Sequence, residues 1–442
     1  MFSNQTRGLA PEHVGVTLAL GLIVNAVFDP IVGSWSDRTR SRLGRRHPFM
    51  FASILPAAGC FFALFNPPDG LSETLELVWL TTFNVILLQA MTLFHTPHLA
   101  LGGELSDDYL GRSSVMSYNI FFLWVGDTAG WVLSFAVFFR ATEKFTNGAL
   151  DPSRYPIFAA TFAIFIIVIF ISSSWFTKRF IPYLPQATPD TPKFGPSEFV
   201  RDFMRALSNR NYVVLLLGMF FLSLMTGVRG GLWFYGASYF WLLDNSDISF
   251  FALGSFVSYL FGAFAATRLH ERFDKRWTGM FALALYCIGP ALPLALGHFE
   301  ILTPQTPGLL WILIAFSVLQ HAPYSIMTTT VYSALADIAD ENEAKFGMRQ
   351  EGILYAARTL FARVDQAIGT AFAGWVLALI AFPAKAVPGE VPAPVLMALA
   401  ATFVLSTIPG LVAAIFYGML RVTRALYDTT RTALDERKLD PV

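Results

Sequence analysis

The sequence has few charged residues and few cysteines. Asp, Glu, Lys and Arg make up only 14% of its 442 residues, and the two cysteines, Cys60 and Cys287, both lie in apolar runs. Two such cysteines argue against a disulfide framework, and neither has neighbours that would complete a metal site. The N-terminal stretch 1–11 lacks the basic-then-apolar pattern of an export signal, so we expect no cleaved leader.

Apolar residues are abundant instead. They make up 55% of the chain, above the roughly 45–50% that is typical of soluble domains, so the composition indicates a protein built for lipid. Lys and Arg together equal Asp and Glu at 31 each. Because the total charge is balanced, it does not point to a nucleic-acid partner, and we expect none.

About eleven apolar runs are long enough to cross the hydrocarbon layer, which takes roughly 20 residues. Backbone groups cannot stay unpaired in lipid, so each run is expected to be a helix. The expected spans are 12–35, 49–65, 75–99, 115–139, 155–176, 212–243, 250–269, 280–297, 309–335, 353–382 and 394–420.

The cations predict the orientation of these spans. Arginines crowd the loop after the first span, and further Lys and Arg lie in 177–210, in 268–276 and in the C-terminal tail, whereas loops 66–74 and 299–308 have none. By the positive-inside rule we expect the basic segments and the C-terminus to face the cytoplasm. The protein itself is expected in the inner membrane of a cell. The mostly acidic loop 104–112 is an exception to this pattern.

The spans divide the chain into an N-terminal bundle of about five (1–176), a proline-rich cytoplasmic linker (177–210), a six-helix bundle (211–420) and a cytoplasmic tail (421–442). Transporters are often built from repeated halves. Five plus six therefore suggests a twelve-helix plan without its first helix, from a truncation or a wrong start. A genuine eleven-span protein is the alternative.

Three stretches resemble one family. They are "DPIVGSWSDRTRSRLGRRHPF" (29–49), "TPHLALGGELSDDYLGRSSVMSYN" (96–119) and "LADIADENEAKFGMRQEGILYAARTLFARVDQAIG" (335–369). Together they resemble the glycoside-pentoside-hexuronide:cation symporters, the melibiose permease branch of the major facilitator superfamily. The resemblance implies an all-α fold of two helical bundles that works by alternating access.

Charged residues at the membrane boundary are candidates for a gate. Asp37 can hold an arginine or a helix N-terminus in one conformation and release it in the other, and Gly33 would let a neighbouring helix approach closely. The alternative is that the arginines only fix topology and that the second, acidic cluster is a solvated loop. The gating candidates are Gly33, Asp37, Arg38, Gly44, Arg45, Arg46, Asp337, Arg349 and Glu351.

Asp29 is the main candidate for coupling to a cation. An ionisable group inside the membrane costs about 2.5–3.5 kcal/mol on insertion scales, so it suggests a function. Asn25 lies one turn earlier, and by resemblance Asp29 corresponds to an aspartate of the family's cation site. That family's sodium users carry acids where this chain has Asn25 and His95, so we expect proton rather than sodium coupling. His95 and His98 could equally be packing histidines.

Arg363 stands where the family has a lysine that links the cation and sugar sites, and we expect Asp29 to be its partner. Other candidates for contacting the solute are His98, Trp124 and Asn119, the last where many members have an arginine. The remaining intramembrane charges could be functional or could be buried pairs that set helix packing. They are Asp127, Arg229, Arg358 and Asp365.

The sequence thus predicts a cation-coupled symporter of a sugar, a glycoside or a similar small solute, most simply a monomer. The alternatives are a lysolipid or amphiphile carrier of the same family and a non-transporting membrane sensor. We expect no enzyme, no cofactor and no metal site, because the spans carry no metal-ligand triad, nucleophile elbow or phosphate loop.

Overall fold

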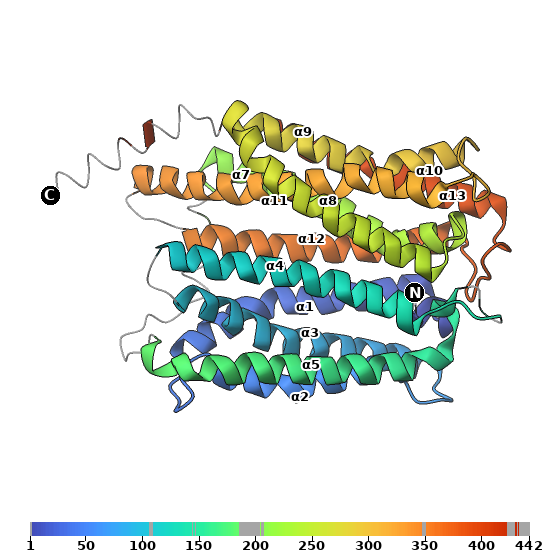
Figure 1. The fold of residues 1–442 in the computed structure, drawn as a ribbon, viewed down its shortest axis with the longest axis horizontal. Coiled ribbons are helices and arrows are strands. Elements are labelled where there is room, and N and C mark those ends of the chain that lie inside the picture. Colours follow the sequence, from blue (N-terminus) through green and yellow to red (C-terminus); the bar gives the residue numbers. More distant parts are fainter. Residues whose placement is uncertain are drawn as a thin grey trace. The chain divides into compact units, whose positions relative to one another are not determined.

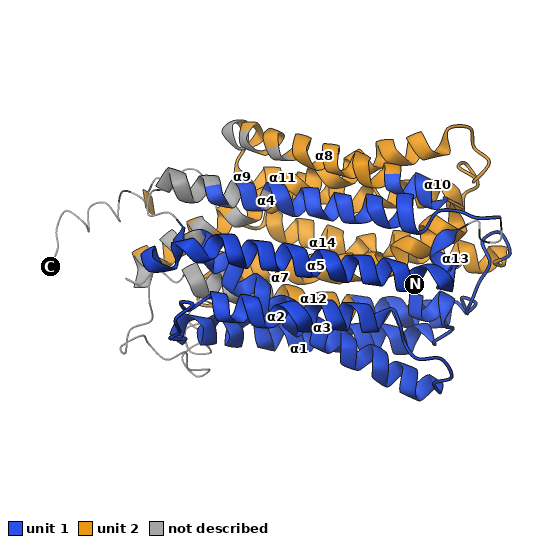
Figure 2. Cartoon of the chain, turned by 60° about the horizontal axis from the view of Figure 1, so that its bottom comes forward, with its two compact units in different colours: residues 1–194, 244–249, 370–390 blue, residues 195–243, 250–369, 391–442 orange. Residues whose placement is uncertain are grey.

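The computed structural model describes residues 2–105, 109–143, 145, 147–184, 204, 207–346, 351–421, 429–430 and 432. Its contacts divide the chain into two compact units (Figure 2). Unit 1 comprises residues 1–194, 244–249 and 370–390, and unit 2 comprises residues 195–243, 250–369 and 391–442. The domain boundaries expected from the sequence stay a prediction.

Unit 1 contains five long helices that can be followed in Figure 1. Short elements join or extend them, among them the π-helices Phe2–Thr6 and Ser134–Phe138. The long helices are α1 (Pro11–Arg38), α2 (His47–Leu64), α3 (Glu73–Glu104), α4 (Tyr109–Leu133) and α5 (Tyr155–Thr177).

Helix α3 is the centre of packing in unit 1. It contacts α1, α2 and α4, and α2 also contacts α5. Met50, Ala90, Phe94 and Phe170 form the core between α2, α3 and α5, and the rings of Phe94 and Phe170 stack with their centroids 3.7 Å apart. Since interiors are close-packed, this core fixes α2 and α5 around α3.

Local sequence explains where these helices begin. The Ser72 side chain accepts a hydrogen bond from the Leu75 amide at the start of α3, which is the standard N-cap contact. Pro11 and Pro48 stand in the first turns of α1 and α2, where no amide hydrogen is needed. Gly44 has a φ of +70° in the tight loop between α1 and α2, a conformation that favours glycine.

In the described residues of unit 2 the regular elements are likewise all helices. Its core lies where α7, α9, α11 and α14 meet, and it includes the fully buried Tyr212, Leu283, Leu335 and Tyr417. The helices are α7 (Arg210–Tyr235), which the π-helix η6 (Gly236–Phe240) extends, α8 (Asn245–Arg272), α9 (Lys275–Ile288), α10 (Ala291–His298), α11 (Leu309–Phe346), α12 (Glu351–Leu379), α13 (Ala393–Leu405) and α14 (Thr407–Gly418). The first residues of α8 and the last turns of α12 belong to unit 1.

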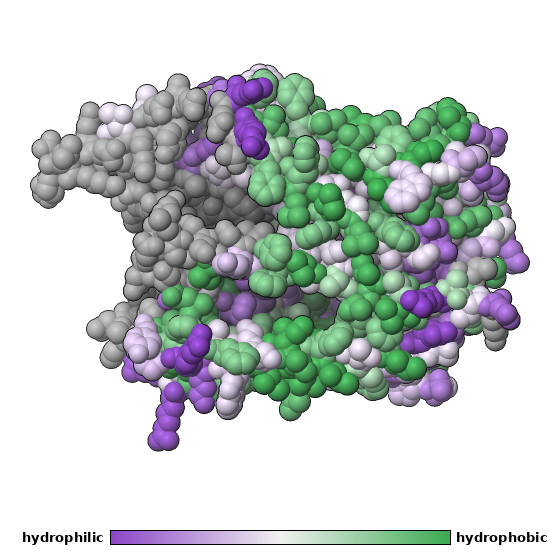
Figure 3. Space-filling view, viewed as in Figure 1, coloured by the Kyte–Doolittle hydropathy of each residue, from purple (hydrophilic) through white to green (hydrophobic). Residues whose placement is uncertain are grey.

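The predicted all-helical membrane architecture is confirmed. Among the described residues, ten helical segments are long and apolar enough to cross a membrane. On the face drawn in Figure 3, apolar side chains gather over the middle of the helices and polar ones near their ends. The eleventh expected span, 353–382, forms helix α12 but is not among the ten. Arg358, Arg363 and Asp365 lower its average hydropathy.

Candidate functional site

Asp29 lies in a small polar cluster within the apolar helices of unit 1. The hydroxyl Oγ1 of Thr92, on α3, is 2.6 Å from Asp29 Oδ1 and 2.7 Å from Asn25 Oδ1, both on α1. Asn25 and Thr92 are buried, and Asp29 is partly buried. Asn25 and Asp29 are four residues apart, so they lie on the same face of α1 and both can reach the one hydroxyl.

Thr92 was not among the candidates that the sequence suggested. Threonine is common in apolar helices, where its hydroxyl usually bonds to the preceding turn, so nothing in the sequence marks this residue. Its place opposite Asp29 depends on the packing of α1 against α3, which only the tertiary structure shows.

The two histidines of α3 have different surroundings. The His98 ring stacks on Phe94 with centroids 5.2 Å apart and is partly buried, whereas His95 is exposed. No group of three His, Cys, Asp or Glu side chains among the described residues could hold a metal ion.

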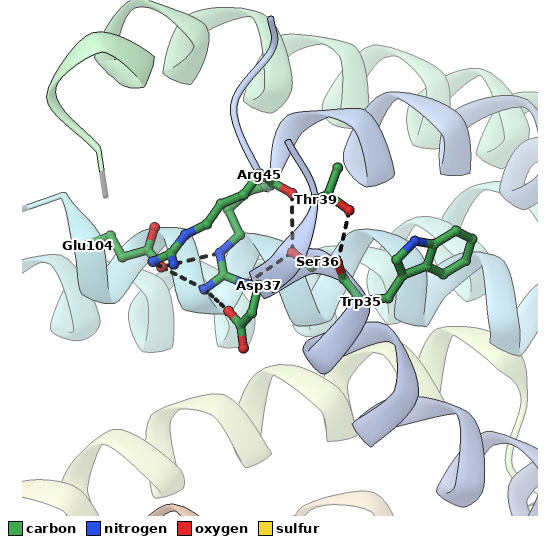
Figure 4. A network of polar contacts seen from close by, with 7 residues as sticks. Trp35, Ser36, Asp37, Thr39, Arg45 and Glu104 are labelled. Carbon is green, nitrogen blue, oxygen red and sulfur yellow. Dashed lines mark hydrogen bonds and ion pairs between the residues drawn. The ribbon is translucent and has the colours of Figure 1, made fainter. Parts of the chain in front are cut away.

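A network of charges joins the adjoining ends of α1, α2 and α3 (Figure 4). Arg46 Nη2 lies 2.6 Å from Asp37 Oδ1 and 2.7 Å from Glu104 Oε1, and its Nη1 donates to Ser36 Oγ at 3.0 Å. Arg45 Nη2 donates to the same Glu104 oxygen at 2.7 Å. One arginine thus bridges two carboxylates from two helices, a strong type of ion pair.

The arrangement of this network goes beyond what the sequence showed. The structure brings the candidates Asp37, Arg45 and Arg46 together. The acceptor that both arginines share, Glu104, was not among the gating candidates, because in the sequence it only begins the mostly acidic loop 104–112. Arg46 is buried, and these two carboxylates compensate its charge. Arg38, the last residue of α1, is only partly buried.

Among the described residues, no neighbouring helix packs unusually closely at Gly33. A Cβ atom at this position would lie 3.6 Å from Thr96 Cγ2, which is an ordinary contact distance. The tight approach to α3 occurs three turns earlier, at Gly21, where a Cβ would lie 2.3 Å from Asn84 Nδ2. Proximity in sequence to the charged motif was therefore a poor guide to the crossing point.

The second cluster of gating candidates is only partly described. Asp337 Oδ2, on α11, lies 2.6 Å from Lys275 Nζ at the start of α9. Glu351 begins α12, but its side chain and that of Arg358 lie outside what the structure describes, as does Arg349 entirely.

The remaining intramembrane candidates differ in burial. In unit 1, Asp127 is exposed, while Asn119 and Trp124, also on α4, are partly exposed. In unit 2, Asp365 is 2% exposed, and its Oδ2 has no hydrogen-bond partner within the described ranges; Arg363 is partly buried. Arg229 is buried but has no carboxylate within 4.0 Å among described side chains, so a buried ion pair, one of the expected alternatives, is not found for it.

Comparison with known proteins identifies the family. The profile described as "MFS/sugar transport protein" matches residues 1–424. The chain is 26% identical to symporter sll1374 of Synechocystis over 99% of this chain and 92% of that protein. It is 22% identical to the putative glycoside/cation symporter YagG of Escherichia coli K12, over 87% and 78% respectively.

Solved structures support the same fold. The structure of a bacterial homologue of the human lysosomal transporter Spinster superposes with a TM-score of 0.66 at 14% identity, over 100% of this chain and 93% of the other. At that identity the likeness concerns the fold alone. Together with the family match, it shows that the chain belongs to the MFS/sugar transport protein family and is a multi-pass membrane transporter of the major facilitator type rather than an enzyme.

Proposed function

We propose that the protein is a proton-coupled symporter of a sugar or glycoside and that Asp29 carries the coupling proton. The family and the description of YagG as a putative glycoside/cation symporter support the substrate class and the coupling. By the same proposal the arginine-rich loop and the C-terminus lie in the cytoplasm, and the transporter acts as a monomer.

The geometry at Thr92 carries the choice of a proton. The structure has two contacts of hydrogen-bond length among three oxygens, and each hydrogen bond needs one hydrogen. The Thr92 hydroxyl supplies one. In the structure, the Thr92 hydroxyl faces both acceptors with its single hydrogen. In the proposed state a protonated Asp29 donates to Thr92 while Thr92 donates to Asn25. The shared hydroxyl therefore supports the proposal that Asp29 carries the coupling proton.

The charge network at Arg46 complements this site. In an alternating-access cycle, contacts at one mouth form while those at the other break. Arg46 holds the ends of α1 and α3 together through Asp37 and Glu104. In the proposed cycle these ion pairs close the cytoplasmic ends of the helices in one state and loosen in the other.

Uptake by proteoliposomes tests the proposal. The purified protein is loaded into vesicles and supplied with a panel of labelled sugars and glycosides under separate proton and sodium gradients. We expect a proton gradient alone to drive accumulation of at least one solute. Asp29→Asn should abolish that accumulation while leaving solute exchange without a gradient, because the amide cannot bind and release a proton.

Asp69→Asn is the matched control, since it makes the same chemical change in an exposed loop of unit 1 and should leave accumulation intact. Accumulation driven by a sodium gradient alone would contradict proton coupling. Undiminished accumulation by Asp29→Asn would contradict the role of Asp29 altogether.

A further inference from the structure

Arg229 forms an unusual buried site in unit 2. Its side chain, on α7, is 7% exposed. Nη2 donates to the carbonyl oxygen of Cys287 and to Thr407 Oγ1, both at 2.7 Å, and Nε donates to Ser406 Oγ at 3.2 Å. The guanidinium also lies over the Phe403 ring, 5.2 Å from its centroid.

All of these partners are neutral. No carboxylate lies within 4.0 Å of Arg229 in the described part of the chain, and its Nη1 is enclosed without a hydrogen-bond partner. Arg46, which is equally buried, has both Asp37 and Glu104 beside it. A buried charge is expensive unless it is compensated, and an arginine is charged at any pH that the protein meets.

The site is built where helices are interrupted. Helix α9 ends at Ile288, and α10 begins only after Pro290, so the Cys287 carbonyl lies among the last acceptors of a helix and is available. Ser406 and Thr407 stand at the break between α13 and α14. Two helix breaks therefore face the one guanidinium, and their polar groups leave Nη1 free.

A cavity lies about one helical turn from this site and shares Phe403 with it. Its volume is about 60 Å³, and its lining includes Trp233, Pro290 and Phe403. Trp233 lies four positions from Arg229, Pro290 three from Cys287, and Phe403 three from Ser406. Each is therefore about one helical turn from the Arg229 site. Phe403 borders both the cavity and the guanidinium.

From this geometry we infer that unit 2 binds a small monovalent anion, a halide or a carboxylate group, at Nη1 of Arg229. The anion supplies the missing countercharge. A cavity of this size has room for a few water-sized groups, since one water needs roughly 10–15 Å³ of such volume. The inference is independent of the coupling site at Asp29.

Thermal unfolding of the purified protein tests it directly. Chloride replaces gluconate at constant sodium concentration and ionic strength, and acetate replaces gluconate in a parallel series. A ligand that binds only the folded state raises its stability. We expect a saturable rise in Tm with chloride, with acetate or with both. The anion that raises Tm shows whether the site binds a free halide or a carboxylate group.

Two variants locate the effect. Arg229→Gln should abolish the anion dependence of Tm, whereas Arg46→Gln, the matched change at a buried arginine with its own carboxylates, should keep it. Ser406→Asp keeps Arg229 and places a carboxylate near Nε. It should make the Tm independent of both anions, and it decides the question if Arg229→Gln does not fold.

A Tm that neither anion changes in the wild-type protein would overturn the inference. So would an anion response that persists in Arg229→Gln or that Ser406→Asp keeps at the wild-type size.

Discussion

At the scale of single residues, one hydroxyl decides the chemistry of the Asp29 cluster. Thr92 Oγ1 lies within hydrogen-bond distance of both Asn25 Oδ1 and Asp29 Oδ1. Valine has the same shape but cannot donate, so Thr92→Val leaves two acceptors without this partner. We expect the free energy of unfolding to fall by about 1–3 kcal/mol and proton-driven uptake to be impaired. Thermal unfolding and proteoliposome uptake measure the two effects.

Two further variants show whether the hydroxyl itself is responsible. Thr92→Ser keeps the donor and should restore uptake. Thr81→Val removes a hydroxyl from the same helix, where it bonds to Leu77 and Thr17 rather than to the cluster, and should leave uptake unchanged. Equal uptake by Thr92→Val and the wild type would remove Thr92 from the proposed proton site.

At the scale of helices, glycines decide how closely two helices pack. A Cβ at Gly227, on α7, would lie 2.7 Å from the carbonyl oxygen of Gln366 and 2.9 Å from the Cα of Gly369, both on α12. Backbone cannot move aside as a flexible side chain can. We therefore expect Gly227→Ala to lower the free energy of unfolding by about 1–3 kcal/mol or more, measured as a drop in Tm.

Gly230 is the matched control on the same helix, because no described residue lies within 4 Å of a Cβ at that position. Gly230→Ala should be neutral or stabilising by up to about 1 kcal/mol, since alanine favours the helix. An equal loss of stability in both variants would show that helix propensity, and not the α7–α12 crossing, governs these positions.

At the scale of the whole molecule, the distribution of cations predicts which loops face the cytoplasm. The native cysteines, Cys60 and Cys287, are buried, so a new surface cysteine can be labelled against a low background. We expect a membrane-impermeant maleimide to label Asp69→Cys in intact cells and to label Arg42→Cys only after the cells are opened. Both positions are exposed in the structure. The reverse pattern would invert the proposed topology.

The sequence predicted the elements better than it predicted the sites. Apolar runs marked the spans because only a helix satisfies its own backbone in lipid, and Asp29 and Arg229 stood out because charge is rare there. Their partners did not stand out. Thr92 looks like any helical threonine, and Glu104 looked like part of a loop, since which side chains face a given charge depends on how distant helices pack.

The sequence by itself determined that this chain is a bundle of membrane helices with a few buried charges, because hydrophobic length and charge depend on local composition. Only the tertiary structure decided which partners surround each buried charge. Asp29 shares the Thr92 hydroxyl with Asn25, and Arg46 is held between two carboxylates. Among the described residues, Arg229 has only neutral partners and one donor without a partner. The physical reason is that compensation of a buried charge needs contacts of about 3 Å, and the residues that make them here are up to 178 positions apart in the chain.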